Sequence, residues 1–290
     1  MSVNDRFKAL LSNITLTDDQ RADGAIKHHG VRQCLNKYYW DSTSETANSM
    51  LIGSWGKSTR VRPPRDVDVL FQLPHAVYQR FQTRIGNKQS ALLQEVKTVL
   101  QKTYPTTDMR GDGQVVVVPF ASFRVEVVPA FLLDNGQYWI CNTHDGGKHV
   151  ATDPKRELEK IEESNKKTGN NTRDLVRMMK CWQQECSVPI KSFHIELLAM
   201  GFLDQWEYAG KTAVYYDWMV RDFLKYLISK TNSYVFAPGT IELMALGSDW
   251  KSRAESAHAR AVKACQYESD GMPYSAGQEW QKIFGYYIPL

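Results

Sequence analysis

Two aspartates one residue apart in an apolar run constrain this chain more than any other feature. The run reads DVDVLF, and its aspartates are Asp66 and Asp68. Residues i and i+2 of a strand point to the same face, so the two carboxylates are predicted to lie side by side, with Cβ atoms about 6.5–7 Å apart. Val67 and Val69 are predicted to face the opposite way, into a core. Such a carboxylate pair suits two divalent ions about 3.5–4 Å apart, the arrangement used for in-line displacement at phosphorus.

A glycine–serine pair and a basic loop precede this strand. Glycine permits close backbone approach, and successive backbone N–H groups form an anion-binding nest to which the hydroxyl of Ser54 adds a donor. The alternative for Gly53-Ser54 is an ordinary turn. The loop after it carries four cations, which either hold a triphosphate or form a solvated face. These cations are Lys57, Arg60, Arg62 and Arg65.

A third carboxylate is needed because two hold a pair of metal ions poorly, and Glu126 is the best candidate. It lies in the apolar run FRVEVVPAF, where an unpaired charge would be costly. Alternation predicts that Glu126 shares a face with Arg124, opposite to Val125 and Val127. The alternative is a structural ion pair between Glu126 and Arg124 or a loop lysine.

The patterning of the chain predicts two lobes. The first 150 residues alternate between strand and helix signals, whereas helical periodicity dominates from residue 151 to 290. No linker separates the lobes, so we expect an active-site cleft between them. The expected elements are a helix to residue 40 behind a capping box at 17–20, strands at 49–53 and 66–72, a helix at 87–102, a hairpin at 115–120 and 123–131, a strand near 137–141, and a helix from Pro154 behind an Asp153 cap.

The helix predicted around residues 175–182 carries an apolar stripe. Leu175, Met178, Met179 and Trp182 have i, i+3, i+4, i+7 spacing. We therefore expect Arg177 and Lys180 on the face away from the stripe, where they either line the cleft or face solvent.

Composition narrows the class of protein. With 42% hydrophobic and 23% charged residues the chain reads as globular, and no apolar run approaches the roughly 20 residues that span a bilayer. No signal-peptide core follows Met1, so we expect a cytoplasmic location. The five cysteines lack a CxxC pair, and the seven histidines lack ligand spacing, which favours free thiols and no zinc site. A net charge of +4 is compatible with anionic substrates but predicts no duplex-binding surface.

Taken in order, these residues resemble the DNA polymerase β-like nucleotidyltransferase superfamily and, within it, the bacterial cGAS/DncV-like enzymes (CD-NTases). The resemblance covers residues 45–285. The matching pieces are Gly53-Ser54, Asp66-x-Asp68, Glu126 in VEVVPAF, TDP at 152–154, LVRMMKCW at 175–182, KSFHIELL at 191–198, and WQKIFG from Trp280.

The resemblance implies an α+β, bilobal enzyme, with a mixed-sheet catalytic lobe over 1–150 and a helical C-terminal lobe over 151–290. Such an enzyme joins nucleoside triphosphates into a cyclic oligonucleotide signal and releases pyrophosphate. Asp66 and Asp68 would bind two Mg²⁺ ions (Mn²⁺ being an alternative), and Glu126 would bind the ion that activates the attacking hydroxyl. The expected nucleotide-binding residues are Gly53, Ser54, Lys57, Arg177, Lys180 and Ser192.

The expected partners also follow from the resemblance. They are nucleoside triphosphates, a downstream effector reached through the product in anti-phage defence, and regulatory proteins; no membrane or zinc is expected. Two alternatives remain: a 2′-5′ oligoadenylate-type or other transferase with linear or modified products, and a silent nucleotide-binding scaffold. The intact carboxylate set argues against the scaffold.

Overall fold

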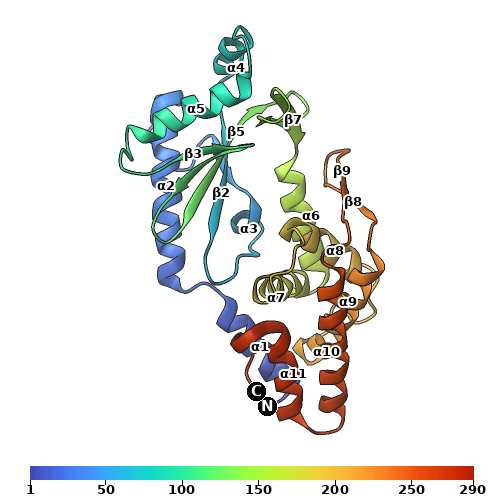
Figure 1. Ribbon diagram of the computed structural model, residues 1–290. Helices are drawn as coiled ribbons and strands as arrows, with labels where there is room; N and C mark the ends of the chain where they lie inside the picture. The colour runs from blue at the N-terminus through green and yellow to red at the C-terminus, as the bar shows by residue number, and fades with distance from the viewer. The chain divides into compact units, whose positions relative to one another are not determined.

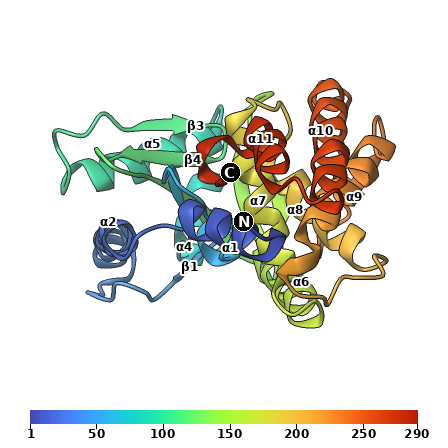
Figure 2. The same ribbon diagram turned by 90° about the horizontal axis from the view of Figure 1, so that it is seen from below.

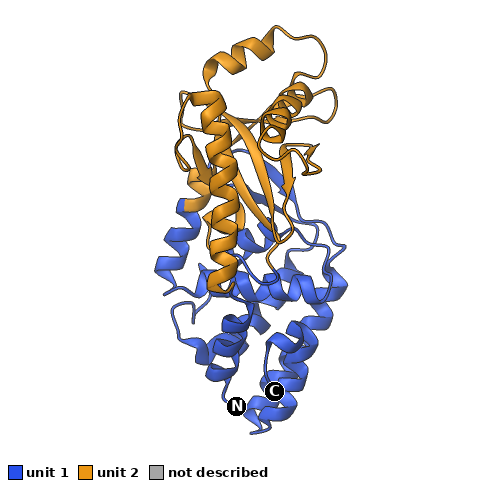
Figure 3. Ribbon diagram, turned by 90° about the vertical axis from the view of Figure 1, so that its left-hand side faces the viewer, with its two compact units in different colours: residues 1–15, 59–63, 159–290 blue, residues 16–58, 64–158 orange. Residues whose placement is uncertain are grey.

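The computed structural model describes residues 1–290, except for the side chain of Asp112. Figure 1 traces the chain from its N-terminal to its C-terminal helices. The residues cluster into two compact units, coloured in Figure 3. We call residues 16–58 and 64–158 the sheet unit, and residues 1–15, 59–63 and 159–290 the helical unit. Each unit contains segments that are far apart in the sequence, unlike the continuous division at residue 150.

The sheet unit is built on seven strands. Five follow the order β1 (Ser49–Leu51), β2 (Asp66–Gln72), β5 (Arg124–Leu132), β4 (Val115–Pro119) and β3 (Arg110–Asp112), while β6 (Tyr138–Asn142) pairs with β5 and β7 (Lys148–Thr152) pairs with β6. The pair β2–β5 is parallel, and the other five strand pairs described in this sheet are antiparallel. The strands predicted at 66–72 and 137–141 and the hairpin of β4 and β5 are confirmed.

Helices cover one face of this sheet. The helices α2 (Asp18–Trp40) and α5 (Lys88–Gln101) share an apolar core with Val67, Val69 and Val127, and Figure 1 shows α2 running alongside the strands. The capping box of Thr17 and Gln20 begins α2 as predicted. Two shorter helices, α3 (Gly53–Gly56) and α4 (His75–Gln82), complete the unit with the first residues of α6. On the opposite face, β2 presents the partly exposed Asp66 and Asp68, whereas Leu70 is buried in a small apolar cluster with Val128 and Ile140.

The helical unit packs around a core of large aromatic side chains. Its helices are α1 (Val3–Ile14), α6 (Pro154–Lys167), α7 (Asn171–Glu185), α8 (Ser192–Leu203), α9 (Tyr216–Ser229), α10 (Lys251–Ser269) and α11 (Pro273–Phe284), and it also holds the hairpin of β8 (Tyr234–Phe236) and β9 (Leu243–Ala245). Figure 2 shows α10 and α11 side by side. Trp182, Trp250 and Trp280 are fully buried in this core. The Asp153 carboxylate accepts from the Arg156 N–H at 3.0 Å, which confirms the predicted cap of α6.

The N-terminal helix α1 belongs to the helical unit, although the sequence placed residues 1–150 in one lobe. Ser2 caps α1 by accepting from the Asp5 N–H. Phe7, Leu10 and Ile14 are then spaced to form one apolar face, and all three are fully buried in the helical core. Their burial explains why this segment packs with residues more than 150 positions away.

Two broad expectations can be compared with the described residues. None of their helices is both long and apolar enough to cross a bilayer. All five cysteines are free thiols, as predicted.

Candidate functional site

The acidic residues of β2 and β5 lie on one face of the sheet because the two strands pair in parallel register. Asp66 pairs with Arg124, and Asp68 pairs with Glu126. Burial alternates along β2, with Val67 and Val69 fully buried and the two aspartates partly exposed. The predicted alternation in both strands is therefore confirmed, and it brings Asp68 beside Glu126.

Arg124 lies among these carboxylates. Its Nη2 atom is 3.7 Å from Asp66 Oδ2 and 3.9 Å from Glu126 Oε1. Both ion pairs are long and partly exposed, so each contributes little to stability. Their effect is local, since one cation offsets part of the repulsion among three neighbouring carboxylates. The ion pair considered for Glu126 is thus present, and Arg124 is shared with Asp66.

Asp66, Asp68 and Glu126 are the candidate ligands of a divalent ion. Within the described part of the chain, no three His, Cys, Asp or Glu side chains converge into a group that could hold an ion. The carboxylates of Asp66, Asp68 and Glu126 therefore share a face but do not form a closed site in this conformation. Carboxylate oxygens are the donors that Mg²⁺ prefers, and the strand register places the three residues on one face of the sheet. The residues therefore fit a divalent ion by their chemistry.

Gly53 is fixed by the close approach of Asp68. A Cβ atom at residue 53 would lie 1.9 Å from Asp68 Oδ2, and the φ angle of +54° disfavours any side chain there. The backbone N–H of Ile52 also donates to the Asp68 carbonyl at 3.0 Å. The turn that begins α3 is thereby held directly against the acidic strand. The sequence predicted a glycine for approach to a phosphate, but it did not predict the contact with Asp68.

The basic loop after α3 is partly used by the protein itself. Lys57 is only 5% exposed, and its Nζ atom lies 2.7 Å from Glu157 Oε2. The Arg62 guanidinium donates to the Ser12 carbonyl at 3.1 Å within the helical unit. At least two of the four cations therefore have protein partners, and the role of Lys57 in nucleotide binding stays a prediction.

The sequence predicted Lys180 on the polar face of α7, away from the apolar stripe. In the structure Lys180 is instead buried, at 5% exposure. Its Nζ atom donates to Glu196 Oε1 at 2.7 Å and to Thr59 Oγ1 at 2.9 Å. Burial of the ammonium is tolerated because Glu196 supplies the opposite charge. This correction concerns the position of Lys180, whereas its contact with nucleotide stays untested.

The other two predicted residues of the helical unit have nearby partners. Arg177 is partly buried and pairs with Asp174 one turn earlier in α7. The Ser192 hydroxyl, at the start of α8, donates to Gln183 Oε1 at 2.9 Å. Both side chains have the polar character required for nucleotide contact, which remains a prediction from the resemblance.

Sequence reasoning missed Thr59 and Glu196. Glu196 had a detectable signal, because it is a single charge in the apolar segment FHIELLAM, the criterion that singled out Glu126. Thr59 had none, because a threonine in a basic loop reads as a solvated residue.

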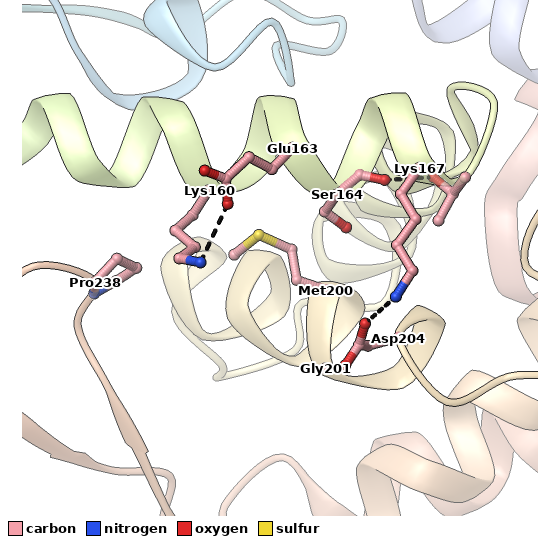
Figure 4. Close-up of a pocket in the computed structure, with 9 residues that line it drawn as sticks. Lys160, Glu163, Ser164, Lys167, Met200, Gly201, Asp204 and Pro238 are labelled. Carbon is pink, nitrogen blue, oxygen red and sulfur yellow. Dashed lines mark hydrogen bonds and ion pairs between the residues drawn. The ribbon is translucent and has the colours of Figure 1, made fainter.

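A groove in the helical unit contains none of the predicted site residues. It has a volume of about 350 Å³ and lies along α6 and α8. Figure 4 shows its charged side chains pairing with one another, Lys160 with Glu163 and Lys167 with Asp204. The lining is thus electrically balanced, and we assign it no ligand.

The fold and this acidic face can now be compared with known proteins. Residues 1–165 match the Second Messenger Oligonucleotide or Dinucleotide Synthetase (SMODS) domain family. This match covers more than half of the chain, which therefore belongs to the SMODS family. Its expected assignment as a bacterial CD-NTase, and thus as a nucleotidyltransferase, is confirmed.

Two curated relatives are similar over most of this chain. A probable cyclic nucleotide synthase of Bacillus cereus is 22% identical over 275 residues, covering 82% of this chain and 81% of the relative. A cyclic AMP-AMP-AMP synthase of an Acinetobacter strain is 25% identical over 218 residues, covering 71% of this chain and 60% of the relative.

Solved structures establish the fold. The CdnC protein of Escherichia coli with ATP gives a TM-score of 0.71 at 18% identity, with 99% of each chain covered. The same protein in a complex with HORMA-deltaN gives 0.70 at 17% identity, covering 99% of this chain and 98% of that chain. The predicted α+β, bilobal nucleotidyltransferase fold is thereby confirmed.

Proposed function

We propose that this protein joins nucleoside triphosphates into a cyclic oligonucleotide and releases pyrophosphate at each step. The observation that carries the proposal is the placement of Asp66, Asp68 and Glu126 on one sheet face, with Asp68 packed against the Gly53 turn. Negative side chains beside a glycine turn suit a polyphosphate carried with divalent ions.

Divalent ions belong to this proposal as partners of the carboxylates. Asp66, Asp68 and Glu126 would hold two Mg²⁺ ions, or Mn²⁺ in their place. When bound, such ions neutralise charge on the triphosphate and lower the pKa of an attacking ribose hydroxyl.

The protein's own groups would orient the reacting atoms. The backbone N–H groups at Gly53 and the hydroxyl of Ser54 would donate to triphosphate oxygens. Arg124 would then exchange its carboxylate partners for phosphate oxygens, because both contacts are long and solvent-exposed. Lys57, Arg177, Lys180 and Ser192 are further nucleotide-binding candidates from the family resemblance.

The cyclic nature of the product is supported by the relatives. Both curated relatives are named as cyclic nucleotide synthases, one of them probable, and the CdnC structure was obtained with ATP. We extend these names to the present chain as a proposal: one site makes a linear intermediate and then closes it with a second bond. A signalling role in anti-phage defence, with an effector and a HORMA-type regulatory partner, is part of the same proposal.

Pyrophosphate release tests the role of the carboxylates. The wild-type protein, Asp66→Asn and Asp68→Asn would be incubated with the four nucleoside triphosphates and Mg²⁺, with Asp134→Asn as a surface control. Asp134 is an exposed residue of the same unit. We expect both site variants to lose release while keeping the wild-type melting temperature, and the control to retain it. Substantial release by either site variant would contradict the proposal.

A further inference from the structure

Five residues of the helical unit lie, in the sequence, between the two elements that carry the predicted catalytic groups. The chain leaves the sheet unit after Ser58 and re-enters it at Pro64. We call residues 59–63 the strap. Helix α3, with Gly53 and Ser54, ends just before the strap, and β2, with the aspartates, begins just after it.

The strap is fixed within the helical unit by burial and by backbone hydrogen bonds. Thr59 is fully buried, and Val61 belongs to the helical core at 7% exposure. The Arg62 N–H donates to the Ile14 carbonyl at 2.8 Å, at the end of α1. The strap is therefore anchored in the helical unit through Thr59, Val61 and the backbone of Arg62.

The hydroxyl of Thr59 closes a buried triangle of hydrogen bonds. It accepts from Lys180 Nζ at 2.9 Å and donates to Glu196 Oε1 at 3.0 Å, while Lys180 and Glu196 form an ion pair at 2.7 Å. All three residues are at most 5% exposed. Only a group that both donates and accepts can make both of these hydrogen bonds. Hydrogen bonds to charged partners in a dry interior are also strong.

The next anchored residue is close enough for movement of Thr59 to reach α3. Lys57 is held by Glu157 in the sheet unit at 2.7 Å, and only Ser58 separates Lys57 from Thr59. Ser58 has a left-handed φ of +57°, so a single residue in an uncommon backbone conformation links the two anchored residues. Because this link is so short, we expect a displacement of Thr59 to be passed along the chain toward the Gly53–Ser54 turn.

We propose that Thr59 is a positioning residue for nucleotidyl transfer. Its hydroxyl, fixed between Lys180 and Glu196, holds the strap and, through Ser58 and Lys57, restrains the Gly53–Ser54 turn. This inference depends on the proposed function of that site.

Three variants at two buried threonines test the inference. Thr59→Val removes both hydrogen bonds without changing size or charge, and Thr59→Ser restores them. Thr172→Val is the matched control: Thr172 is fully buried in the same unit, and its hydroxyl bonds to Ser164 and Thr168, away from the strap. We expect kcat/KM for nucleoside triphosphates to fall about tenfold or more in Thr59→Val, because small misplacements of reacting groups are costly. Thr59→Ser should stay within about twofold of wild type, and Thr172→Val should lower the melting temperature without lowering kcat/KM.

Amide hydrogen exchange tests whether Thr59 holds the turn without requiring the protein to be enzymatically active. In Thr59→Val, we expect faster amide exchange over residues 53–62, including the turn outside the strap. Thr172→Val should leave these residues unchanged. Faster exchange limited to residues 59–62, or a wild-type kcat/KM in a folded Thr59→Val, would overturn the inference. If the wild-type protein makes no product, the proposed function fails, while the exchange pattern still decides whether Thr59 holds the turn.

Discussion

At the scale of single residues, two factors decide which side chain a position can hold. One is the steric space available to it, and the other is the presence of a partner for a buried charge. Gly53 is determined by the carboxylate of Asp68, which occupies the space of a side chain. Lys180 and Glu196 are buried together, and each compensates the charge of the other. The buried Asp217 is compensated less fully, since its Oδ1 atom has no side-chain or backbone hydrogen-bond partner. For these positions we can therefore predict whether a substitution raises or lowers turnover or stability.

Substitution of Gly53 should damage the site more than the fold. Gly53→Ala must strain the backbone by about 1–2 kcal/mol at positive φ and displace Asp68, so we expect about a 100-fold loss of turnover. Gly86→Ala is the control, because Gly86 also has a positive φ but no atom within 4 Å of its added Cβ. Melting temperatures and turnover of both variants would be compared. Equal turnover in the two would contradict the role given to the Gly53–Asp68 contact.

Asp217 should make stability depend on pH. Burial is the largest of the causes that raise the pKa of Asp217 from 3.8 to about 6, with nearby Arg221 and Cys265 opposing it. A folded pKa above the unfolded value gives most stability below pH 4 and loses it as the pH rises through 6. The loss should reach on the order of 3 kcal/mol. Asp217→Asn should abolish this loss, so the difference in melting temperature between variant and wild type should change between pH 5 and 7.5. Parallel melting curves over that range would count against it.

At the scale of elements, local patterns predicted the strands and their faces, but not their partners. Alternation in FRVEVVPAF placed Glu126 opposite to Val125 and Val127, and the structure agrees. The parallel pairing of β2 with β5 is a long-range contact, so no local signal contains it. The prediction for Lys180 was wrong for a similar reason. Helix α7 contacts α1, α8, α9 and α11, and a helix packed on several sides has little exposed surface. An apolar stripe shows which side of a helix is buried most, but not whether the other sides are also covered.

The ion pair of Lys57 and Glu157 should behave as one structural unit joining α3 to α6. We expect Lys57→Met and Glu157→Gln each to lower the free energy of unfolding by on the order of 2 kcal/mol, because each breaks a largely buried ion pair. The double variant should lose little more than either single variant. Denaturant unfolding of the four proteins measures this coupling. Additive losses, with a raised KM only in Lys57→Met, would instead assign Lys57 to nucleotide binding.

At the scale of the whole molecule, segments distant in sequence share each core. Residues 1–15 complete the helical unit, and the strap returns to it between α3 and β2. The continuous division at residue 150 could not be corrected from the sequence, because α1 is a short amphipathic helix that any apolar surface could accept. Its burial in the helical core depends on tertiary packing, which the local sequence of α1 does not encode.

Loss of the α1 anchor should therefore affect distant helices rather than the neighbouring sheet. Phe7→Ala removes a fully buried ring that contacts Trp280 and Phe284 edge-on, and it should cost about 3–5 kcal/mol. Ile26→Ala is the control, since Ile26 is 72% exposed. We expect faster hydrogen exchange in α7 and α11 of Phe7→Ala, with β2 and β5 unchanged. Faster exchange mainly in β2 and β5 would show that α1 supports the sheet unit.

The central claim is that this protein makes a cyclic oligonucleotide, and the mass of its product tests it most directly. Purified protein would be incubated with all four nucleoside triphosphates and Mg²⁺ or Mn²⁺, treated with phosphatase and analysed by mass spectrometry. We predict a phosphatase-resistant species at the mass of a cyclic di- or trinucleotide, which would also identify its bases. An active preparation that yields only linear or modified products would contradict the claim and favour another nucleotidyltransferase reaction at the same carboxylates.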